Sequence, residues 1–244
     1  MILRDIHFGK IGVAPPSFDL SVDNVVFGFD GDQLQVLLIR QGLLGEDTGA
    51  DRFQMAIPGD LVHPDEGLDE AASRILSNLT SLNGVYLKQF RAFGDPKRVA
   101  DQKDREWLQR MRAFPDRRVV TIGYYSLVAL SEYEPRPSSF ASRAEWCPLT
   151  DIPRLAFDHN EIVSAALEKL REDASRHALV YELLPEKFTL GQFQRLHEII
   201  LDKTLDKRNF RKNVKKMTEV IPLDEKQEGV LHKPAQLFTY RQSS

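Results

Sequence analysis

The first part of the chain alternates between short apolar runs and polar turns. Two apolar runs, 24–29 and 34–41, flank an Asp-Gly turn, and this arrangement is a strong signal for a β-hairpin. Residues 42–53 are typical of a surface loop, and 55–62 predict a short strand that enters a Pro-Gly turn. From residue 68 the apolar period becomes helical, so we expect an amphipathic helix. Its apolar face consists of Leu68, Ala71, Ala72, Ile75, Leu76 and Leu79.

Strands and helices continue to alternate through the middle of the chain. Apolar, β-branched and aromatic residues predict strands at 85–93 and 117–130. The stretch 98–114 is charged and mostly free of helix breakers, so it predicts an inserted surface helix. Residues 143–173 predict a strand, a proline-punctuated loop and a long helix. Mixed strands with helices between them favour an α/β (α+β) sandwich, which we assign to residues 1–180.

The C-terminal part has a different order of elements. Thr189 and Gln192 have the spacing of a capping box, which predicts a helix that starts there and ends near Leu201. A short turn then leads into a basic helix at 207–217. Two strands of a hairpin follow, at 219–223 and 236–241. Two helices, a short turn and a hairpin are the order of a winged helix-turn-helix.

Composition adds a contrast between the two parts. The 244 residues carry a net charge of −3, but residues 185–244 hold 12 Lys and Arg against 8 Asp and Glu. An acidic body joined to a basic C-terminal domain (residues 181–244) indicates that only that domain meets a polyanion. The single cysteine, Cys147, excludes an intrachain disulfide framework and a cysteine-based zinc site. With no long apolar run and no signal-peptide pattern, we expect a cytoplasmic protein without membrane contact.

The helix at 207–217 has one apolar stripe and one cationic face. Phe210, Val214 and Met217 recur at helical spacing and predict the docking side. The other face combines Lys and Arg, which neutralise phosphates, with Asn, which like Arg can make bidentate contacts to base edges. A solvated basic face, or a surface for RNA or an acidic protein, is the alternative, but the flanking elements favour duplex DNA. The candidate DNA-binding residues are Thr189, Gln192, Lys207, Arg208, Asn209, Arg211, Lys212 and Lys215.

The stretch from Pro58 to Leu82 resembles the Nudix box, whose pattern is Gly, five residues, Glu, seven residues, then Arg-Glu-aliphatic-x-Glu-Glu-x-Gly. Glu66, Arg74 and Leu76 match this pattern. Asp60 stands at the first glycine, and Ser81 or Leu82 stands where a glycine and an aliphatic residue belong. The three metal-binding glutamates are replaced by Ile75, Asn78 and Leu79. Ile and Leu offer no oxygen ligand to a hard divalent cation, so we expect no metal, no cofactor and no Nudix hydrolysis.

Several further segments extend this resemblance over nearly the whole chain from about residue 20. They are FGDPKRV (93–99), RRVVTIGYYSLV (117–128), IPRLAFDHNEIV (152–163) and LDKRNFRK (205–212). With the degenerate box, they are similar to the Nudix-related transcriptional regulators, in which a Nudix-like effector domain precedes a winged helix-turn-helix. The charged insertion at 97–116 is longer than the family norm.

The resemblance implies a homodimer that binds operator DNA and responds to a metabolite, either ADP-ribose in NAD control or a sugar in sugar-utilisation control. It places the effector cleft near Arg40, the 58–66 turn, Arg74 and the 93–99 segment. His159 stays open between a ligand contact and a helix-start or core role. The candidate effector-binding residues are Arg40, Glu66, Arg74 and Phe93. A Nudix hydrolase of ADP-ribose or a related nucleoside diphosphate is the alternative function.

Overall fold

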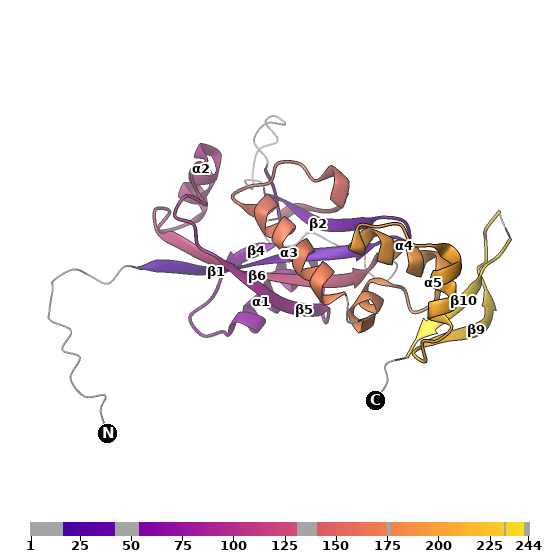
Figure 1. Ribbon diagram of the computed structural model, residues 1–244. Helices are drawn as coiled ribbons and strands as arrows, with labels where there is room; N and C mark the ends of the chain where they lie inside the picture. The colour runs from indigo at the N-terminus through magenta and orange to yellow at the C-terminus, as the bar shows by residue number, and fades with distance from the viewer. Residues whose placement is uncertain (1–16, 42–53, 131–140, 175–176, 232, 242–244) are drawn as a thin grey trace, which may run out of the picture.

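A long parallel pair of strands forms the centre of the molecule. The computed structural model describes residues 17–41, 54–130, 141–174, 177–231 and 233–241, so the loop predicted at 42–53 lies outside the described residues. In it, β1 (Phe18–Phe29) pairs in parallel with β6 (Arg118–Ala129) along its whole length (Figure 1). Because both strands are flanked by further strands and covered by helices, their buried positions form nearly continuous runs.

Five antiparallel strands complete the first sheet. On one side, β5 (Tyr86–Phe93) pairs with β6. On the other side, β1 pairs with β2 (Leu34–Gln41) at one end and with β4 (Gly59–Leu61) nearer the other. Strand β2 also pairs with β3 (Gln54–Ala56) and β7 (Ala141–Pro148).

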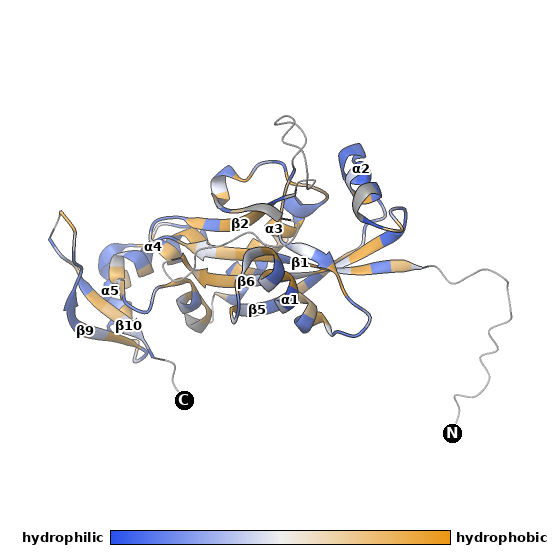
Figure 2. Cartoon of the chain, turned by 180° about the vertical axis from the view of Figure 1, so that it is seen from behind, coloured by the Kyte–Doolittle hydropathy of each residue, from blue (hydrophilic) through white to orange (hydrophobic). Residues whose placement is uncertain are grey.

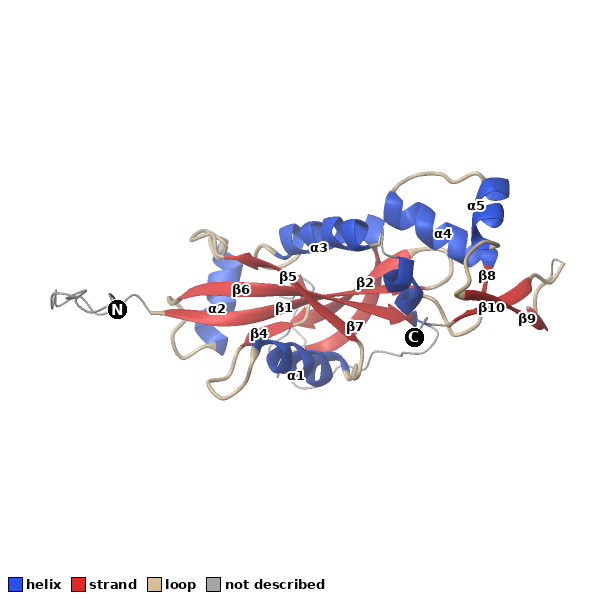
Figure 3. Ribbon diagram, turned by 60° about the horizontal axis from the view of Figure 1, so that its bottom comes forward, coloured by secondary structure: helices blue, strands red, loops and turns tan. Residues whose placement is uncertain are grey.

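Two helices cover opposite faces of this sheet, α1 (Leu68–Thr80) and α3 (His159–Asp173), as Figure 3 shows. The periodicity that predicted α1 is confirmed, since five of the six apolar positions are buried there, including Ile75 and Leu79. A short 3-10 helix, η3 (Leu149–Asp151), follows β7. The charged helix α2 (Gln102–Met111) stands at the end of the molecule opposite the winged domain (Figure 1).

The C-terminal part is the predicted winged helix. The 3-10 helix η4 (His177–Leu183) leads into β8 (Phe188–Thr189), α4 (Leu190–Leu201) and α5 (Lys207–Val214). Strands β9 (Val220–Lys226) and β10 (Gln236–Tyr240) form the hairpin, and β8 completes a three-stranded sheet. The capping box is confirmed: the Gln192 backbone N–H donates to Thr189 Oγ1 at 3.2 Å, and the Thr189 backbone N–H donates to Gln192 Oε1 at 2.9 Å.

The two parts share one continuous apolar cluster. It runs from Phe27 in β1 and Leu170 in α3 to Phe193 in α4 and Phe210 in α5. The boundary predicted between residues 180 and 181 falls inside η4, whose Tyr181 ring stacks on Tyr240 with centroids 3.7 Å apart. Figure 2 shows the apolar colours gathered on the central strands, while α2 and α5 are mostly hydrophilic. Within the described residues, no helix combines the length and apolar character needed to cross a membrane.

Element boundaries differ from the predictions where a turn or a long-range pairing intervenes. The predicted strand 24–29 starts six residues earlier, at Phe18, because its polar start pairs with β4 and β6. The predicted strand 55–62 is broken at Pro58, which has no N–H to donate and whose carbonyl accepts from Asn24 N at 2.7 Å. The insertion helix begins only after Asp101, whose side chain caps it, and the basic helix ends at Val214.

Candidate functional site

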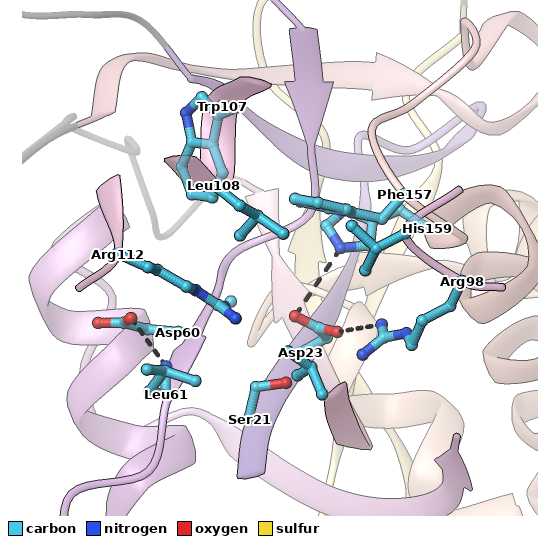
Figure 4. Close-up of a pocket in the computed structure, with 13 residues that line it drawn as sticks. Ser21, Asp23, Asp60, Leu61, Arg98, Trp107, Leu108, Arg112, Phe157 and His159 are labelled. Carbon is cyan, nitrogen blue, oxygen red and sulfur yellow. Dashed lines mark hydrogen bonds and ion pairs between the residues drawn. The ribbon is translucent and has the colours of Figure 1, made fainter. Parts of the chain in front are cut away.

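A cavity of about 270 Å³ opens where β1, β4 and α2 meet (Figure 4). Strands β1 and β4 supply one wall, and α2 with the residue that follows it supplies another. The segment 98–99, the start of α3 with the preceding Phe157, and Val119 of β6 complete it. The lining residues are Ser21, Asp23, Gly59, Asp60, Leu61, Arg98, Val99, Trp107, Leu108, Arg112, Val119, Phe157 and His159.

A buried ion-pair network holds one side of this cavity. The Arg98 side chain, 6% exposed, donates to both Asp158 oxygens at 2.7 and 2.9 Å and lies 3.4 Å from Asp23 Oδ2. Burial alone would lower the pKa of Arg98, but the two carboxylates outweigh burial and raise it. The pairing therefore fixes β1 to the loop before α3, although these residues are far apart in the sequence.

His159 is a buried, neutral part of the same network. Its Nδ1 accepts from Ile57 N at 3.3 Å, so Nε2 carries the proton and faces Asp23 Oδ1 at 3.9 Å. Burial lowers the pKa of His159, since charging the ring away from water is unfavourable. The ring belongs to the first residue of α3 and is buried, as the helix-start or core role predicts, and it also lines the cavity, so a ligand contact stays a prediction.

An aromatic wall faces the ion-pair network. The Trp107 and Phe157 rings meet edge to face with centroids 5.8 Å apart, and Phe157 also contacts His159 at 5.3 Å. Phe157 has a left-handed backbone with φ of 55°, which is strained for a bulky residue. The Asp104 side chain of α2 accepts from Phe157 N at 3.1 Å and helps to hold that conformation. Burial raises the pKa of Asp104.

The lining therefore combines aromatic edges, hydrogen-bond acceptors and guanidinium groups. Aromatic side chains pack on a planar ring, carboxylates such as Asp23 accept from sugar hydroxyls, and arginine binds phosphate. A nucleotide-like ligand offers all three groups. Among the described residues, no group of three or more His, Cys, Asp or Glu side chains is arranged to hold a metal ion.

Two predicted effector residues, Glu66 and Arg74, bind each other instead of lining the cavity. Arg74 donates to Glu66 at 2.7 and 2.8 Å and to the Leu61 carbonyl at 2.8 Å, while Glu66 also accepts from His63 N. The hydrogen bonds from Arg74 lower the pKa of Glu66 to about 2. This pair closes the turn between β4 and α1 and holds the lining residues Asp60 and Leu61 through Arg74.

The other two predicted effector residues also lie outside the lining. Phe93 is 4% exposed and packs edge to face on Phe90 at 5.9 Å, since the last residue of β5 turns into the core. Arg40 lies on β2 opposite Met55 of β3. The predicted cleft and the cavity coincide only at Gly59–Leu61 and Arg98–Val99.

The sequence reasoning missed the contribution of α2, which it treated as a surface helix. Trp107 and Leu108 are adjacent apolar residues in a helix that is otherwise mostly charged or polar, and Leu108 is 1% exposed. Two adjacent apolar side chains in a charged helix indicate a side that is covered, and this was the available signal. Arg112, at the C-cap of α2, is half-buried and reaches into the cavity.

The box helix α1 is packed where a Nudix enzyme would bind metal. Ile75 and Leu79, at two of the three glutamate positions, are 0% and 2% exposed and belong to an apolar cluster. Asn78 at the third position is exposed. Ile75 and Leu79 thus lie on the buried apolar face that the sequence predicted for this helix.

A second candidate site is the exposed face of α5. Asp206 caps the helix by accepting from Asn209 N at 2.8 Å, and Phe210 and Val214 are buried as the stripe predicted. The cationic side chains on the opposite face are exposed, and none forms an ion pair with a described residue. Five of them surround one shallow depression: Lys207, Arg208, Arg211, Lys212 and Lys215.

Thr189 and Gln192, the two remaining predicted DNA-binding residues, have a structural task in α4. Their side chains bond to each other and to the backbone in the capping box, and Thr189 is 5% exposed. They therefore set where α4 begins, while the cationic face of α5 is open to solvent.

A ligand-sized cavity in an α/β domain, joined to a winged helix with an open cationic helix, defines a ligand-sensing DNA-binding regulator. The comparisons agree: residues 180–240 match the NrtR DNA-binding winged helix domain, and residues 18–166 match the NUDIX domain. The chain belongs to the NUDIX domain family and carries at its C-terminal side an NrtR-type DNA-binding domain. The fold and the class of regulator predicted from the sequence are thus confirmed.

Individual relatives resemble the chain over most of its length. It is 29% identical over 231 residues to the ADPR responsive transcriptional repressor NtrR of Acinetobacter baylyi, covering 92% of this chain and 83% of the relative. The crystal structure of Shewanella oneidensis NrtR complexed with a 27mer DNA matches with a TM-score of 0.65 at 25% identity, covering 91% and 93%. A MutT/nudix family protein from Enterococcus faecalis shares the fold, with a TM-score of 0.65, 20% identity and coverage of 94% and 88%.

Proposed function

We propose that this chain is a transcriptional repressor that binds ADP-ribose, or a related nucleoside diphosphate sugar, in the cavity between β1, β4 and α2. Binding there changes the affinity of α5 for operator DNA. The Acinetobacter baylyi relative is described as ADPR responsive and as a repressor, which supports the choice of effector and the sign of the regulation. The supporting feature of the cavity is its mixture of an aromatic wall, carboxylates and arginines.

The Nudix domain of this regulator binds its ligand without hydrolysing it. The observation that carries this proposal is the burial of Ile75 and Leu79 at two of the three positions where the box needs glutamates. Hydrolysis of a diphosphate by this family's chemistry needs oxygen ligands that place a divalent cation on the phosphates. Apolar side chains at 0% and 2% exposure cannot supply them.

The regulator works as a homodimer in the cytoplasm. One α5 per protomer, related to its partner by a two-fold axis, would read the two half-sites of a palindromic operator about one helical turn apart. Size-exclusion chromatography with light scattering tests the dimer, and a mass of one chain would contradict it.

The function is tested by two assays on the same full-length protein. In fluorescence anisotropy, a labelled duplex from the promoter region next to the chain's own gene should bind more tightly than a scrambled duplex or an RNA hairpin. ADP-ribose should then lower that affinity. In the second assay, ADP-ribose is incubated with the protein and Mg²⁺ or Mn²⁺, and release of AMP is followed by chromatography. Metal-dependent release at an enzymatic rate would show a hydrolase, and an operator affinity indifferent to every nucleotide and sugar tried would refute the sensing role.

A further inference from the structure

We infer that Arg112, contributed by the charged insertion, is the phosphate-binding residue of the cavity and sets its preference for phosphorylated ligands. This inference rests on the proposed function, since it names the residue that would recognise the anionic part of the effector. It assigns a binding role to a segment that the sequence marked only as a surface insertion.

The other arginines close to the cavity already have direct partners. The Arg98 guanidinium binds Asp158 and Asp23. The Arg74 guanidinium donates to Glu66 and to the Leu61 carbonyl. The side chain of Arg112 makes no hydrogen bond or ion pair within the described part of the chain. It is therefore the lining cation whose donors are available to a ligand.

The environment of Arg112 favours an incoming anion. Burial lowers the pKa of its guanidinium, which means that the cation has lost hydration without a direct counter-ion. Three carboxylates attract the Arg112 cation electrostatically from beyond ion-pair distance, and each of them has another arginine closer to it. These pairs are Asp19 with Arg117 at 3.5 Å, Asp60 with Arg74 at 3.7 Å and Asp23 with Arg98 at 3.4 Å. A phosphate would give Arg112 the charge-assisted hydrogen bonds it lacks.

One helix places the cation and the aromatic wall together. Arg112 is the C-cap of α2, held by its own N–H donating to the Leu108 carbonyl at 2.9 Å. Leu108 is buried and Trp107 packs on Phe157, so the end of α2 is anchored on the domain. Figure 4 shows the Arg112 side chain entering the cavity between Asp60 and Asp23. A ligand that lays a ring against Trp107 can therefore present a phosphate to Arg112.

The ligand class follows from these positions. Carboxylates at Asp23 and Asp60 suit hydroxyl donors of a sugar, while Arg112 suits a phosphate attached to that sugar. We therefore expect AMP and ADP-ribose to bind more tightly than adenosine, which has the ring and the sugar but no phosphate.

Isothermal titration calorimetry on the full-length protein tests the inference with three ligands, ADP-ribose, AMP and adenosine. Arg112→Gln should weaken ADP-ribose and AMP by at least about tenfold, the loss expected for hydrogen bonds to a charged group, and adenosine by less than about threefold. Arg112→Lys keeps the charge without the planar fork and should retain part of the phosphate preference. The matched control is Arg105→Gln, an equal loss of charge on an exposed position of α2, which should leave all three affinities unchanged.

The outcomes separate the inference from the proposed function. Thermal melting first confirms that each variant is folded, and Arg112→Lys decides the matter if Arg112→Gln does not fold. A wild-type protein that prefers AMP over adenosine, with the same preference in Arg112→Gln, would overturn the role of Arg112 and leave the sensing function standing. A wild-type protein that binds no phosphorylated ligand would overturn both.

Discussion

The salt dependence of DNA binding by α5 gives the sharpest test of the nucleic-acid interface. The segment 207–216 carries six exposed cations, and the described residues provide none of them with an ion pair. The acid beside them, Asp206, is occupied in capping the helix. Each cation that neutralises a phosphate should contribute about 0.9 to the slope of log affinity against log salt. Six contacts would give a slope of about −5 per protomer.

The same arithmetic gives the effect of removing single charges. Raising salt from about 50 to about 200 mM should cost roughly 3.5-fold in affinity for each phosphate contact. Lys212→Gln and Lys215→Gln should therefore each reduce the slope by about 0.9 per protomer, on operator and scrambled duplexes alike. Arg208→Ala should behave differently. If Arg208 contacts a base edge, the substitution should weaken the affinity for the operator by more than about tenfold and the affinity for the scrambled duplex by much less. A bidentate base contact contributes roughly 1–3 kcal/mol.

Fluorescence anisotropy over a range of salt concentrations measures these slopes. The control is Lys97→Gln, which removes an exposed charge from the first domain. If Lys97→Gln reduced the slope as much as Lys212→Gln does, binding would depend on overall charge and not on α5. If the α5 variants kept the wild-type slope, this helix would not face the phosphates, and the interface would have to be assigned elsewhere.

Three further changes probe the shape of the pocket and the stability of the fold. Glu66→Gln should lower the melting temperature at pH 7, and its difference from wild type should shrink as the pH falls from 4.5 towards 2. The stability that comes from the lowered pKa of Glu66 is present above pH 4.5 and is lost as the pH falls to about 2, so a pH-independent difference would contradict this. In Gly59→Ala the new Cβ would lie 1.9 Å from Asp23 Oδ1, so effector affinity should fall in calorimetry, whereas Gly67→Ala, with no neighbour nearer than 3.7 Å, is the control that should retain it. Asp202→Gly should raise the free energy of unfolding in urea by about 0.5–1 kcal/mol, because residue 202 ends α4 with a left-handed φ of 50° that glycine adopts without strain; an equal or lower value would show that the carboxylate matters more than the backbone.

Features with a local cause could be predicted from the sequence. The apolar face of α1, the capping box at Thr189 and the docking stripe of α5 each depend on side chains a few residues apart. Helical periodicity and capping chemistry therefore sufficed for them. The winged helix followed from the order of such elements, and the packing role of Ile75 and Leu79 followed from their place in the helical stripe.

The pocket could not be predicted in the same way, because its contacts join distant segments. The pairing of Arg98 with Asp158 spans 60 residues, and the bond from Phe157 to Asp104 spans 53. No periodicity links such positions. The sequence of a charged helix such as α2 also does not show which part of the molecule its few apolar residues contact. For Arg74 the box resemblance suggested a ligand contact, which stays a prediction, whereas the structure shows a hydrogen bond to Glu66, eight residues before it in the sequence.

Strand β1 and helix α3 connect the cavity to the DNA-binding part, and this connection explains how a bound ligand would influence that part. The first half of β1 lines the cavity with Ser21 and Asp23, and α3 begins at the cavity with His159. The turn after β1 meets α4, where Arg195 Nε donates to the Asp32 carbonyl at 3.0 Å. The far end of α3 also meets α4, since Arg171 Nε donates to the Ile200 carbonyl at 3.0 Å.

Helix α4 in turn carries α5, because Phe193 packs edge to face on Phe210 with centroids 5.5 Å apart. A ligand alters DNA affinity only if it binds two arrangements of these elements unequally. Asp23 and His159, whose contacts a phosphate or sugar would change, belong to β1 and α3, and α3 and the turn after β1 are hydrogen-bonded to α4. A small shift of either element at the cavity must therefore be absorbed at the α4 contacts or move α5, and the continuous apolar cluster between them leaves little room to absorb it.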